Sequence, residues 1–202
     1  LSLTGFDLNL GIQTSLPAAV EISGATTLPA KLFGEIISKL SSDSPINLIT
    51  DDSGEKVKLI SQSGTYEMRG LNPDDFPDLP LVESGTSLKI NPNIFANALR
   101  STLFASSPDE SKQILTGVHL IFDGISLQAA ATDGHRLAVL NLDNAISSTS
   151  TSELNDSETE KIEVTLPSKS LREIERFITT LKTGEDISLF YDRGQVVFIA
   201  LD

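Results

Sequence analysis

The residue types that could do chemistry gather in one short stretch, ATDGHRLAVL, at residues 131–140. Within a few positions it holds a hydroxyl, a carboxylate, an imidazole and a guanidinium, on Thr132, Asp133, His135 and Arg136. A nucleophile, a base and an orienting acid are the parts of a hydrolytic triad. One hypothesis is therefore an acid–base enzyme that works through Asp133 and His135.

The spacing within this stretch favours a second interpretation, a polar turn between two strands. Adjacent strand residues point to opposite faces, so one short turn brings three catalytic groups together poorly. The other histidine, His119, lies in the alternating stretch GVHLIF, which is typical of a strand surface. The sequence shows no zinc-ligand spacing and no phosphate-binding glycine loop. We therefore expect no catalytic residue, no metal and no cofactor.

Composition limits the class of protein. The 202 residues are 39% hydrophobic, enough for one large domain or two of about 100 residues with real cores. The absence of cysteine excludes disulfides and thiolate sites and fits a reducing compartment. No apolar run approaches the roughly 20 residues of a membrane helix. The net charge of −13 argues against nucleic-acid binding over the whole surface and is compatible with an acidic interaction module.

Hydrophobic periodicity predicts mostly antiparallel strands with three helices. Alternating residues indicate strands joined by tight turns in four stretches, at residues 1–16, 46–70, 118–142 and 187–202. Helical spacing is found in three others, at residues 28–40, 91–106 and 166–181. Pro92 is a plausible helix start and Ser168 a candidate cap. The stretch 72–87 is typical of a linker, and 144–161, rich in Ser and Thr, predicts an exposed, mobile loop.

One pattern occurs twice in the chain. TLPAKLFGEIISKL begins at Thr27 and TLPSKSLREIERFI begins at Thr165, and each runs on into a strand that ends in Asp. Upstream, Asp7 of the first copy aligns with Asp133 of the second. The second copy also has an earlier strand–helix–strand half, about residues 87–124, that the first lacks. The repeat predicts an α+β fold of strand–helix–strand units, with antiparallel sheets outside and helices on one face.

The basic residues are not spread evenly. Nine of the 15 lie in or beside the three predicted helices, whereas the acidic residues concentrate in loops and in the linker. An ordinary solvated helix face would account for this distribution. The alternative is a positive helical surface that touches a polyanion on one side of an otherwise acidic protein.

Several motifs resemble the bacterial sliding clamp family, the beta subunit of DNA polymerase III. They are ATDGHRLA at residues 131–138, DFPDLP at 75–80, and the helix entries TTLPAKLF and LPSKSLREI. The resemblance extends over essentially the whole chain. It implies that residues 1–80 are the C-terminal part of a first clamp domain, and that 87–202 are the second, central domain without its last strand. The first domain's opening half and the third domain would be missing, so we expect no ring closure from these residues alone.

The family resemblance also implies a function. Its members are homodimeric rings that encircle double-stranded DNA independently of sequence, in the bacterial cytoplasm at the nucleoid. As non-catalytic subunits of the polymerase holoenzyme, they tether the polymerase, the clamp loader and other proteins that carry a clamp-binding motif. No membrane partner is implied.

The resemblance assigns residues to two surfaces. One wall of a partner-peptide groove would comprise Thr132, Gly134, His135, Arg136 and Leu137. Residues expected to face DNA are Lys39, Arg100, Lys112, Arg172 and Arg176. We expect these surfaces to act independently, because the turn should lie away from the helix-lined hole.

Overall fold

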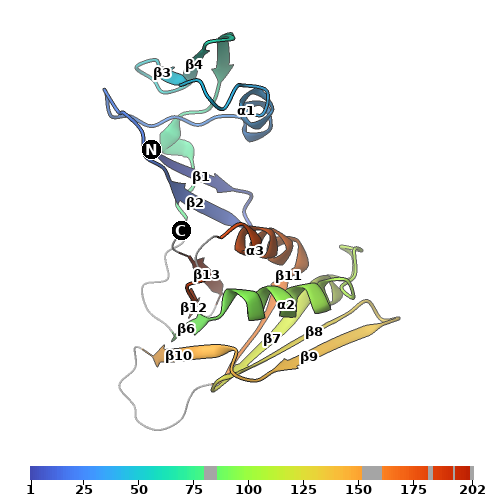
Figure 1. The fold of residues 1–202 in the computed structure, drawn as a ribbon. Helices are drawn as coiled ribbons and strands as arrows, with labels where there is room; N and C mark the ends of the chain where they lie inside the picture. The colour runs from blue at the N-terminus through green and yellow to red at the C-terminus, as the bar shows by residue number, and fades with distance from the viewer. Residues whose placement is uncertain (80–85, 152–160, 182–183, 193, 201–202) are drawn as a thin grey trace. The chain divides into compact units, whose positions relative to one another are not determined.

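The computed structural model describes residues 1–79, 86–151, 161–181, 184–192 and 194–200. Its internal contacts divide the chain into two units, Leu1–Leu79 and Pro80–Asp202. Figure 1 shows the elements of each unit, and the two are described separately below. No helix in the described ranges is long and apolar enough to cross a membrane.

The first unit consists of a hairpin, a helix and a small sheet. Strands β1 (Ser2–Phe6) and β2 (Gly11–Ser15) form the hairpin, which is followed by helix α1 (Ala30–Ile37). Strands β3 (Asn47–Thr50), β4 (Lys56–Ser61) and β5 (Gly64–Arg69) form an antiparallel sheet in that order. A 3-10 turn, η1 (Pro73–Asp75), leads out of this sheet.

The amphipathic face of α1 explains how this sheet is covered. Val57, Leu59 and Met68 are buried on the sheet, and half-buried Phe33 and Ile37 of the helix segment pack against them. A fully buried side chain of this kind stabilises a fold by about 1.5–3 kcal/mol. The helical spacing in residues 28–40 thus produces a helix on one face of a sheet, as the sequence predicts.

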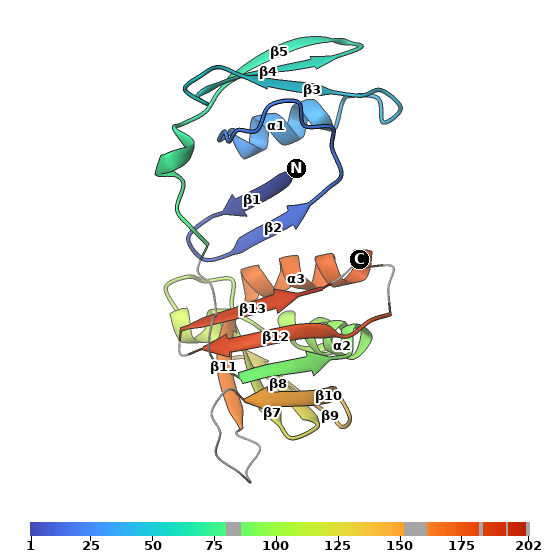
Figure 2. The same cartoon turned by 90° about the vertical axis from the view of Figure 1, so that its left-hand side faces the viewer.

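The second unit has two four-stranded antiparallel sheets and two helices. One sheet has the order β10-β6-β12-β13 and the other β11-β7-β8-β9, as Figure 2 shows from the side of the first sheet. The strands of the first sheet are β6 (Thr86–Ile90), β10 (Ile146–Thr151), β12 (Ile187–Asp192) and β13 (Gln195–Ile199). Those of the second are β7 (Gly117–Asp123), β8 (Ser126–Thr132), β9 (Leu137–Leu142) and β11 (Ile162–Pro167).

Helices α2 (Pro92–Leu103) and α3 (Ser168–Thr180) pack against each other, and α2 also contacts β8 and β9. Between α2 and β7 lies a 3-10 turn, η2 (Gln113–Thr116). One continuous core joins both helices to both sheets, with Phe95, Phe122 and Leu171 among its fully buried members. The predicted α+β architecture of antiparallel sheets with helices is confirmed.

The two copies of the repeat fold alike in their local order. Helix α1 begins directly after Pro29, and α3 begins directly after Pro167. An antiparallel hairpin follows each helix, β3–β4 in the first copy and β12–β13 in the second. Residue 193, in the turn of the second hairpin, lies outside the described residues. So do residues 201–202, the end of the predicted strand stretch 187–202.

Two local predictions are wrong. Ser168 is not the cap of α3, because Pro167 takes the cap position, and the buried Ser168 hydroxyl has no hydrogen-bond partner among the described residues. The stretch 144–161 is not one exposed loop, because its first part forms β10, which pairs with β6. Ala145 and Ile146 are buried there, so this part contributes to the core. Residues 152–160 lie outside the described residues.

Candidate functional site

The candidate site is the turn between β8 and β9, at residues 132–137, hereafter the docking turn. Thr132 ends β8 and Leu137 begins β9, and the two residues face each other across the hairpin. Gly134 has a φ of +91°, a left-handed conformation that glycine adopts without a steric penalty. The strand pairing and this glycine bring all five predicted groove residues onto one short loop.

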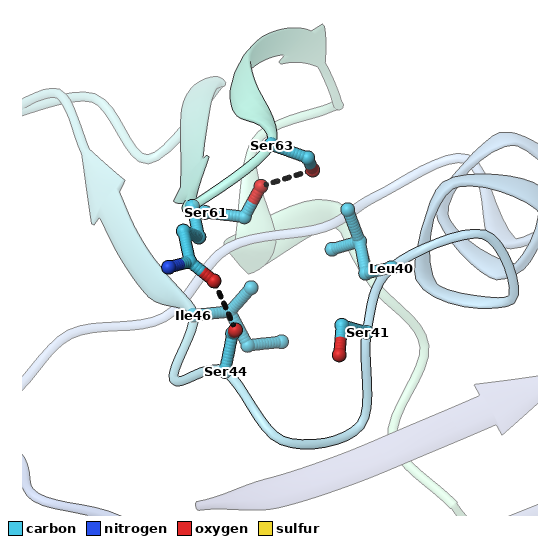
Figure 3. A pocket seen from close by; sticks show the side chains of 7 residues that line it. Leu40, Ser41, Ser44, Ile46, Ser61 and Ser63 are labelled. Atoms are coloured by element: carbon cyan, nitrogen blue, oxygen red, sulfur yellow. Dashed lines mark hydrogen bonds between the residues drawn. The ribbon is translucent and has the colours of Figure 1, made fainter.

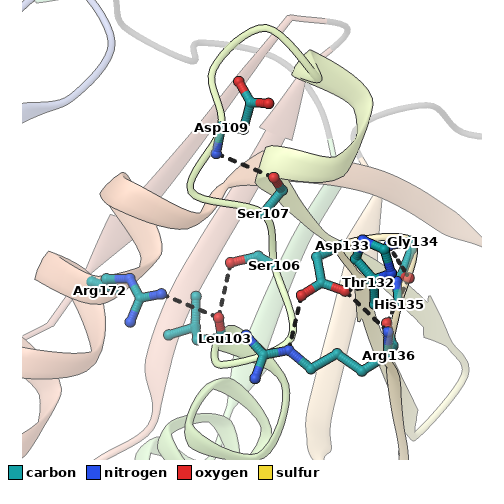
Figure 4. Close-up of polar contacts among 10 residues, drawn as sticks. All are labelled: Leu103, Ser106, Ser107, Asp109, Thr132, Asp133, Gly134, His135, Arg136 and Arg172. Atoms are coloured by element: carbon teal, nitrogen blue, oxygen red, sulfur yellow. Dashed lines mark hydrogen bonds and ion pairs between the residues drawn. The ribbon is translucent and has the colours of Figure 1, made fainter.

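The side chain of Asp133 builds the turn. Its Oδ1 accepts the backbone N–H groups of His135, at 2.9 Å, and of Arg136, at 3.0 Å, as Figure 4 shows. Thr132 adds two further bonds: its Oγ1 accepts the N–H of Gly134 at 3.1 Å and donates to the carbonyl of Arg136 at 2.7 Å. A short polar side chain that bonds the backbone two and three residues ahead is the usual way an Asx turn is fixed.

These bonds also bear on the acid–base question. The N–H groups of His135 and Arg136 hold the pKa of the Asp133 carboxyl below its ordinary value, and the Arg136 charge adds to this effect. Asp133 bonds the backbone of His135 rather than orienting its ring. These bonds give the carboxylate a structural role in the turn, and they lend no support to the hypothesis of an acid–base enzyme at Asp133 and His135.

Arg136 links the turn to a neighbouring segment. Its Nε donates to Asp133 Oδ2 at 2.9 Å, and its guanidinium carbon lies 5.7 Å from the centre of the Phe104 ring. A guanidinium over an aromatic face at this distance is a cation–π contact. Asp133 and Phe104 together fix where the Arg136 charge lies.

Two apolar residues lie beside the turn that the sequence analysis does not predict as part of the site. Phe104 directly follows α2 and is 55% exposed. Leu115, on η2, lies 4.0 Å from the position that a Cβ on Gly134 would occupy. With Leu137, which is 67% exposed, they give the turn an apolar surface beside one fixed charge. The only sequence signal for Phe104 was its position at the very end of a helical stretch, and Leu115 had none.

The residues expected to face DNA lie on several elements, and three of them share one pair of helices. Arg100 is on α2 and pairs with Glu175 of α3 at 2.6 Å. Arg176 pairs with Glu173 on its own helix at 3.3 Å. Arg172 Nη2 donates to the Leu103 carbonyl at 3.1 Å. These arginines therefore lie on a surface of mixed charge rather than on a purely basic one.

The two lysines of the predicted set belong to other elements of the fold. Lys112 immediately precedes η2 in the second unit, and Lys39 follows α1 in the first. The predicted set is thus one helical cluster plus two separate residues.

The first unit contains a cavity of about 210 Å³ at the end of α1 (Figure 3). Its polar side chains bond one another: Ser44 Oγ donates to Gln62 Oε1 at 2.8 Å, and the Ser61 and Ser63 hydroxyls are 2.9 Å apart. Its lining is neutral, with Leu40 and Ile46 as the apolar part. Among the residues that the structure describes, no group of three His, Asp or Glu side chains could hold a metal ion.

Comparison with known proteins gives matches along the whole chain. Residues 1–80 match the model of the DNA polymerase III beta subunit, N-terminal domain, and residues 89–201 match that of its central domain. The beta sliding clamp of Synechococcus elongatus is 49% identical over 198 residues, which are 98% of this chain and 50% of that protein. The clamp of Synechocystis sp. is 43% identical over 204 residues, covering 98% and 52%.

Solved structures agree with these matches. The DNA polymerase sliding clamp of Bacillus subtilis superposes with a TM-score of 0.80 at 26% identity, over 98% of this chain and 51% of that one. A Helicobacter pylori beta clamp bound to a DNA ligase peptide gives a TM-score of 0.80 at 24% identity, over 98% and 52%. The chain spans about half the length of the curated relatives that it matches.

Proposed function

Because this chain belongs to the family of the DNA polymerase III beta subunit, we propose that it is part of a sliding clamp, a non-catalytic ring that encircles duplex DNA. The ring, a homodimer of the full-length protein, keeps the replicative polymerase on its template at the bacterial nucleoid. The observation that carries this proposal is the docking turn, where an exposed leucine lies next to an arginine held by a hydrogen bond, on a paired hairpin.

Within that ring, residues 1–80 form the C-terminal part of the first clamp domain and 87–202 the central one. The division of contacts between Leu79 and Pro80 supports a boundary inside the linker stretch 72–87. So does the repeated order of helix and hairpin in the two units. Tandem copies of one fold suit a ring, whereas catalysis needs no such duplication.

The docking turn serves as one wall of a groove for partner peptides. Leu137 offers apolar contact, Arg136 a hydrogen-bond donor at the rim, and Gly134 the tight bend that exposes both. Phe104 and Leu115 extend the apolar part. The residues of this wall are Thr132, Gly134, His135, Arg136 and Leu137. The polymerase, the clamp loader and other proteins with a clamp-binding motif would share it, as one relative binds a DNA ligase peptide.

The surface of α2 and α3 faces the DNA. Phosphate contacts there would be independent of sequence and sensitive to salt, because each releases counterions. The residues proposed to contact DNA are Arg100, Arg172 and Arg176 on these helices, Lys112 just before η2, and Lys39 just after α1 in the first unit. The ion pairs of Arg100 with Glu175 and of Arg176 with Glu173 would weaken the binding of phosphate, as a sliding protein requires.

The test is topological and uses the full-length protein. A clamp loaded on nicked circular plasmid should stay bound in moderate salt and should be lost quickly when the plasmid is cut, because a ring slides off a free end. Equal retention on circular and linear DNA would indicate ordinary binding and contradict the ring. No retention on either would favour an acidic interaction module without DNA contact.

A further inference from the structure

A short segment, residues 103–107, connects the two proposed surfaces within the second unit. It begins with the last residue of α2 and runs between helix α3 and the docking turn. Figure 4 shows Arg172 and Arg136 reaching toward it from opposite sides. The position of this segment therefore bears on both surfaces.

On the α3 side, Arg172 holds the end of α2. Its Nη2 donates to the Leu103 carbonyl at 3.1 Å in a partly buried contact. The same carbonyl accepts the Ser106 hydroxyl at 2.8 Å and the Ser106 N–H at 3.3 Å. A cation at the negative end of a helix dipole makes a charge-assisted bond, which is stronger than a neutral one. Arg172 thus fixes the carbonyl of the residue just before Phe104.

On the turn side, the same segment makes two contacts. Phe104 lies under the Arg136 guanidinium. The N–H of Ser107 donates to the Leu115 carbonyl at 2.8 Å, and the Leu115 side chain lies beside Gly134. A shift of the segment would therefore move both the aromatic ring beneath Arg136 and the apolar wall beside Gly134.

We infer that Arg172 is a positioning residue for the docking turn: by holding the Leu103 carbonyl, it places Phe104 under Arg136 and keeps the groove wall in its binding shape. The inference rests on the proposed peptide-binding function of that turn. It joins two surfaces that the sequence predicts to be independent. A continuous series of contacts runs from Arg172 through residues 103–107 to the docking turn, and it provides a physical route for this coupling.

The coupling has a consequence for DNA. A phosphate that binds Arg172 competes with the Leu103 carbonyl for the same guanidinium, so DNA in the ring would loosen the segment. Linkage then requires that a bound peptide, which favours the ordered segment, weakens the hold of Arg172 on phosphate by the same factor. Partner binding and DNA grip would oppose each other through one side chain.

Arg176 provides a matched control on the same helix. It carries the same charge one turn further along, and its hydrogen bond goes to Glu173 of α3. Loss of charge alone predicts that Arg172→Ala and Arg176→Ala change peptide affinity equally. Loss of positioning predicts an effect of Arg172→Ala only.

The experiment measures fluorescence polarisation of a fluorescein-labelled peptide from the replicative polymerase of the source organism, on the full-length protein without DNA. Arg172→Ala should weaken binding roughly threefold to tenfold, and Arg176→Ala should leave it unchanged. Arg172→Lys, which keeps one donor, should recover part of the loss. Circular dichroism verifies that each variant is folded. If Arg172→Ala is not folded, the peptide affinity of Arg172→Lys is the test of the inference.

A double-mutant cycle separates positioning from general structural damage. In a Phe104→Ala background, Arg172→Ala should have a clearly smaller effect than in the unmodified protein, because its route to Arg136 is gone and only the route through Ser107 and Leu115 remains. An undiminished effect in that background would overturn the inference. So would normal binding by Arg172→Ala while Leu137→Ala binds weakly. Failure of the unmodified protein to bind the peptide would instead overturn the proposed function itself.

Discussion

In the β1–β2 turn of the first unit and the β8–β9 turn of the second, an aspartate makes the same pair of hydrogen bonds to the backbone. In the first, Asp7 Oδ1 accepts the N–H groups of Asn9 at 2.9 Å and of Leu10 at 2.7 Å. In the second, Asp133 Oδ1 bonds the equivalent N–H groups at 2.9 and 3.0 Å. One aspartate at the same position therefore specifies the shape of both turns.

What the two scaffolds display is different. The residue after the aspartate is left-handed in both, but it is Leu8, at φ +74°, in the first turn and Gly134, at φ +91°, in the second. Two positions further on, Leu10 stands where Arg136 stands in the second turn. The comparison shows that the aspartate determines the conformation, and that the following residues determine whether the turn can dock a partner.

The largest effect on peptide binding should come from removing the two side chains that only the second turn presents, those of Arg136 and Leu137. In the full-length protein, Arg136→Ala and Leu137→Ala should each weaken polymerase-peptide binding by roughly tenfold to a hundredfold, since anchors of this kind contribute about 1–3 kcal/mol. Fluorescence polarisation measures the affinity. Leu10→Ala, at the equivalent position of the first turn, is the matched control and should bind normally. If Leu10→Ala weakened peptide binding as much as Arg136→Ala did, the proposed functional difference between the two turns would be contradicted.

A smaller effect should come from exchanging the left-handed residues. Gly134→Ala should destabilise its turn by about 1–2 kcal/mol, because a Cβ in this conformation meets the backbone. Leu8→Gly removes the same strain from the first turn, and glycine's greater entropy loss offsets it by about 0.5–1 kcal/mol. That turn should therefore be unchanged or slightly more stable.

Amide hydrogen exchange in each turn measures these changes locally. Protection at the amides of His135 and Arg136 should fall in Gly134→Ala, and protection at those of Asn9 and Leu10 should persist in Leu8→Gly. A clear loss of protection in Leu8→Gly would show that Leu8 is held by packing rather than strained.

Acid should affect the second turn through Asp133. Folding lowers the pKa of this carboxyl, so its ionised form stabilises the fold above the ordinary aspartate pKa of about 4. That contribution disappears as the pH falls through the lowered folded-state value. Asp133→Asn keeps an acceptor for both N–H groups and lacks the charge. Urea unfolding midpoints of the two proteins should differ at pH 7 and converge toward pH 3, whereas a constant difference would contradict this account.

Much of this architecture follows from local sequence. The alternation of residues and the Asp-led turns predict the hairpins, and the spacing of apolar residues predicts all three helices. The equivalence of Asp7 and Asp133 also follows from the sequence, because the repeat aligns the two residues. These features depend on interactions within a few residues of one another, which a pattern in the chain records directly.

Features that depend on distant partners were not visible. Strand β10 consists mainly of Ser and Thr, so no apolar alternation marked it, and it forms by backbone pairing with β6. The bond from Arg172 to the Leu103 carbonyl joins residues 69 positions apart. A basic residue on a helix face gave no indication of whether it would meet DNA, an acidic neighbour or a carbonyl.

The smallest effect concerns the start of the two matching helices. Ala30 follows Pro29 in the first copy, and Ser168 follows Pro167 in the second. The Ser168 hydroxyl is buried without a hydrogen-bond partner among the described residues, which is unfavourable by about 1–3 kcal/mol for a group that was hydrated before folding. Ser168→Ala, which copies the first unit, removes that penalty and fills nearly the same space. Because such groups often relax partly, we expect Ser168→Ala to raise the free energy of unfolding by at most about 1 kcal/mol, which would be measured as a slightly higher urea midpoint. Ala30→Ser, at an exposed position, is the reciprocal control and should change the midpoint little. A marked destabilisation by Ser168→Ala would show that the hydroxyl has a partner, and that the second helix start differs from the first in its chemistry as well as in its sequence.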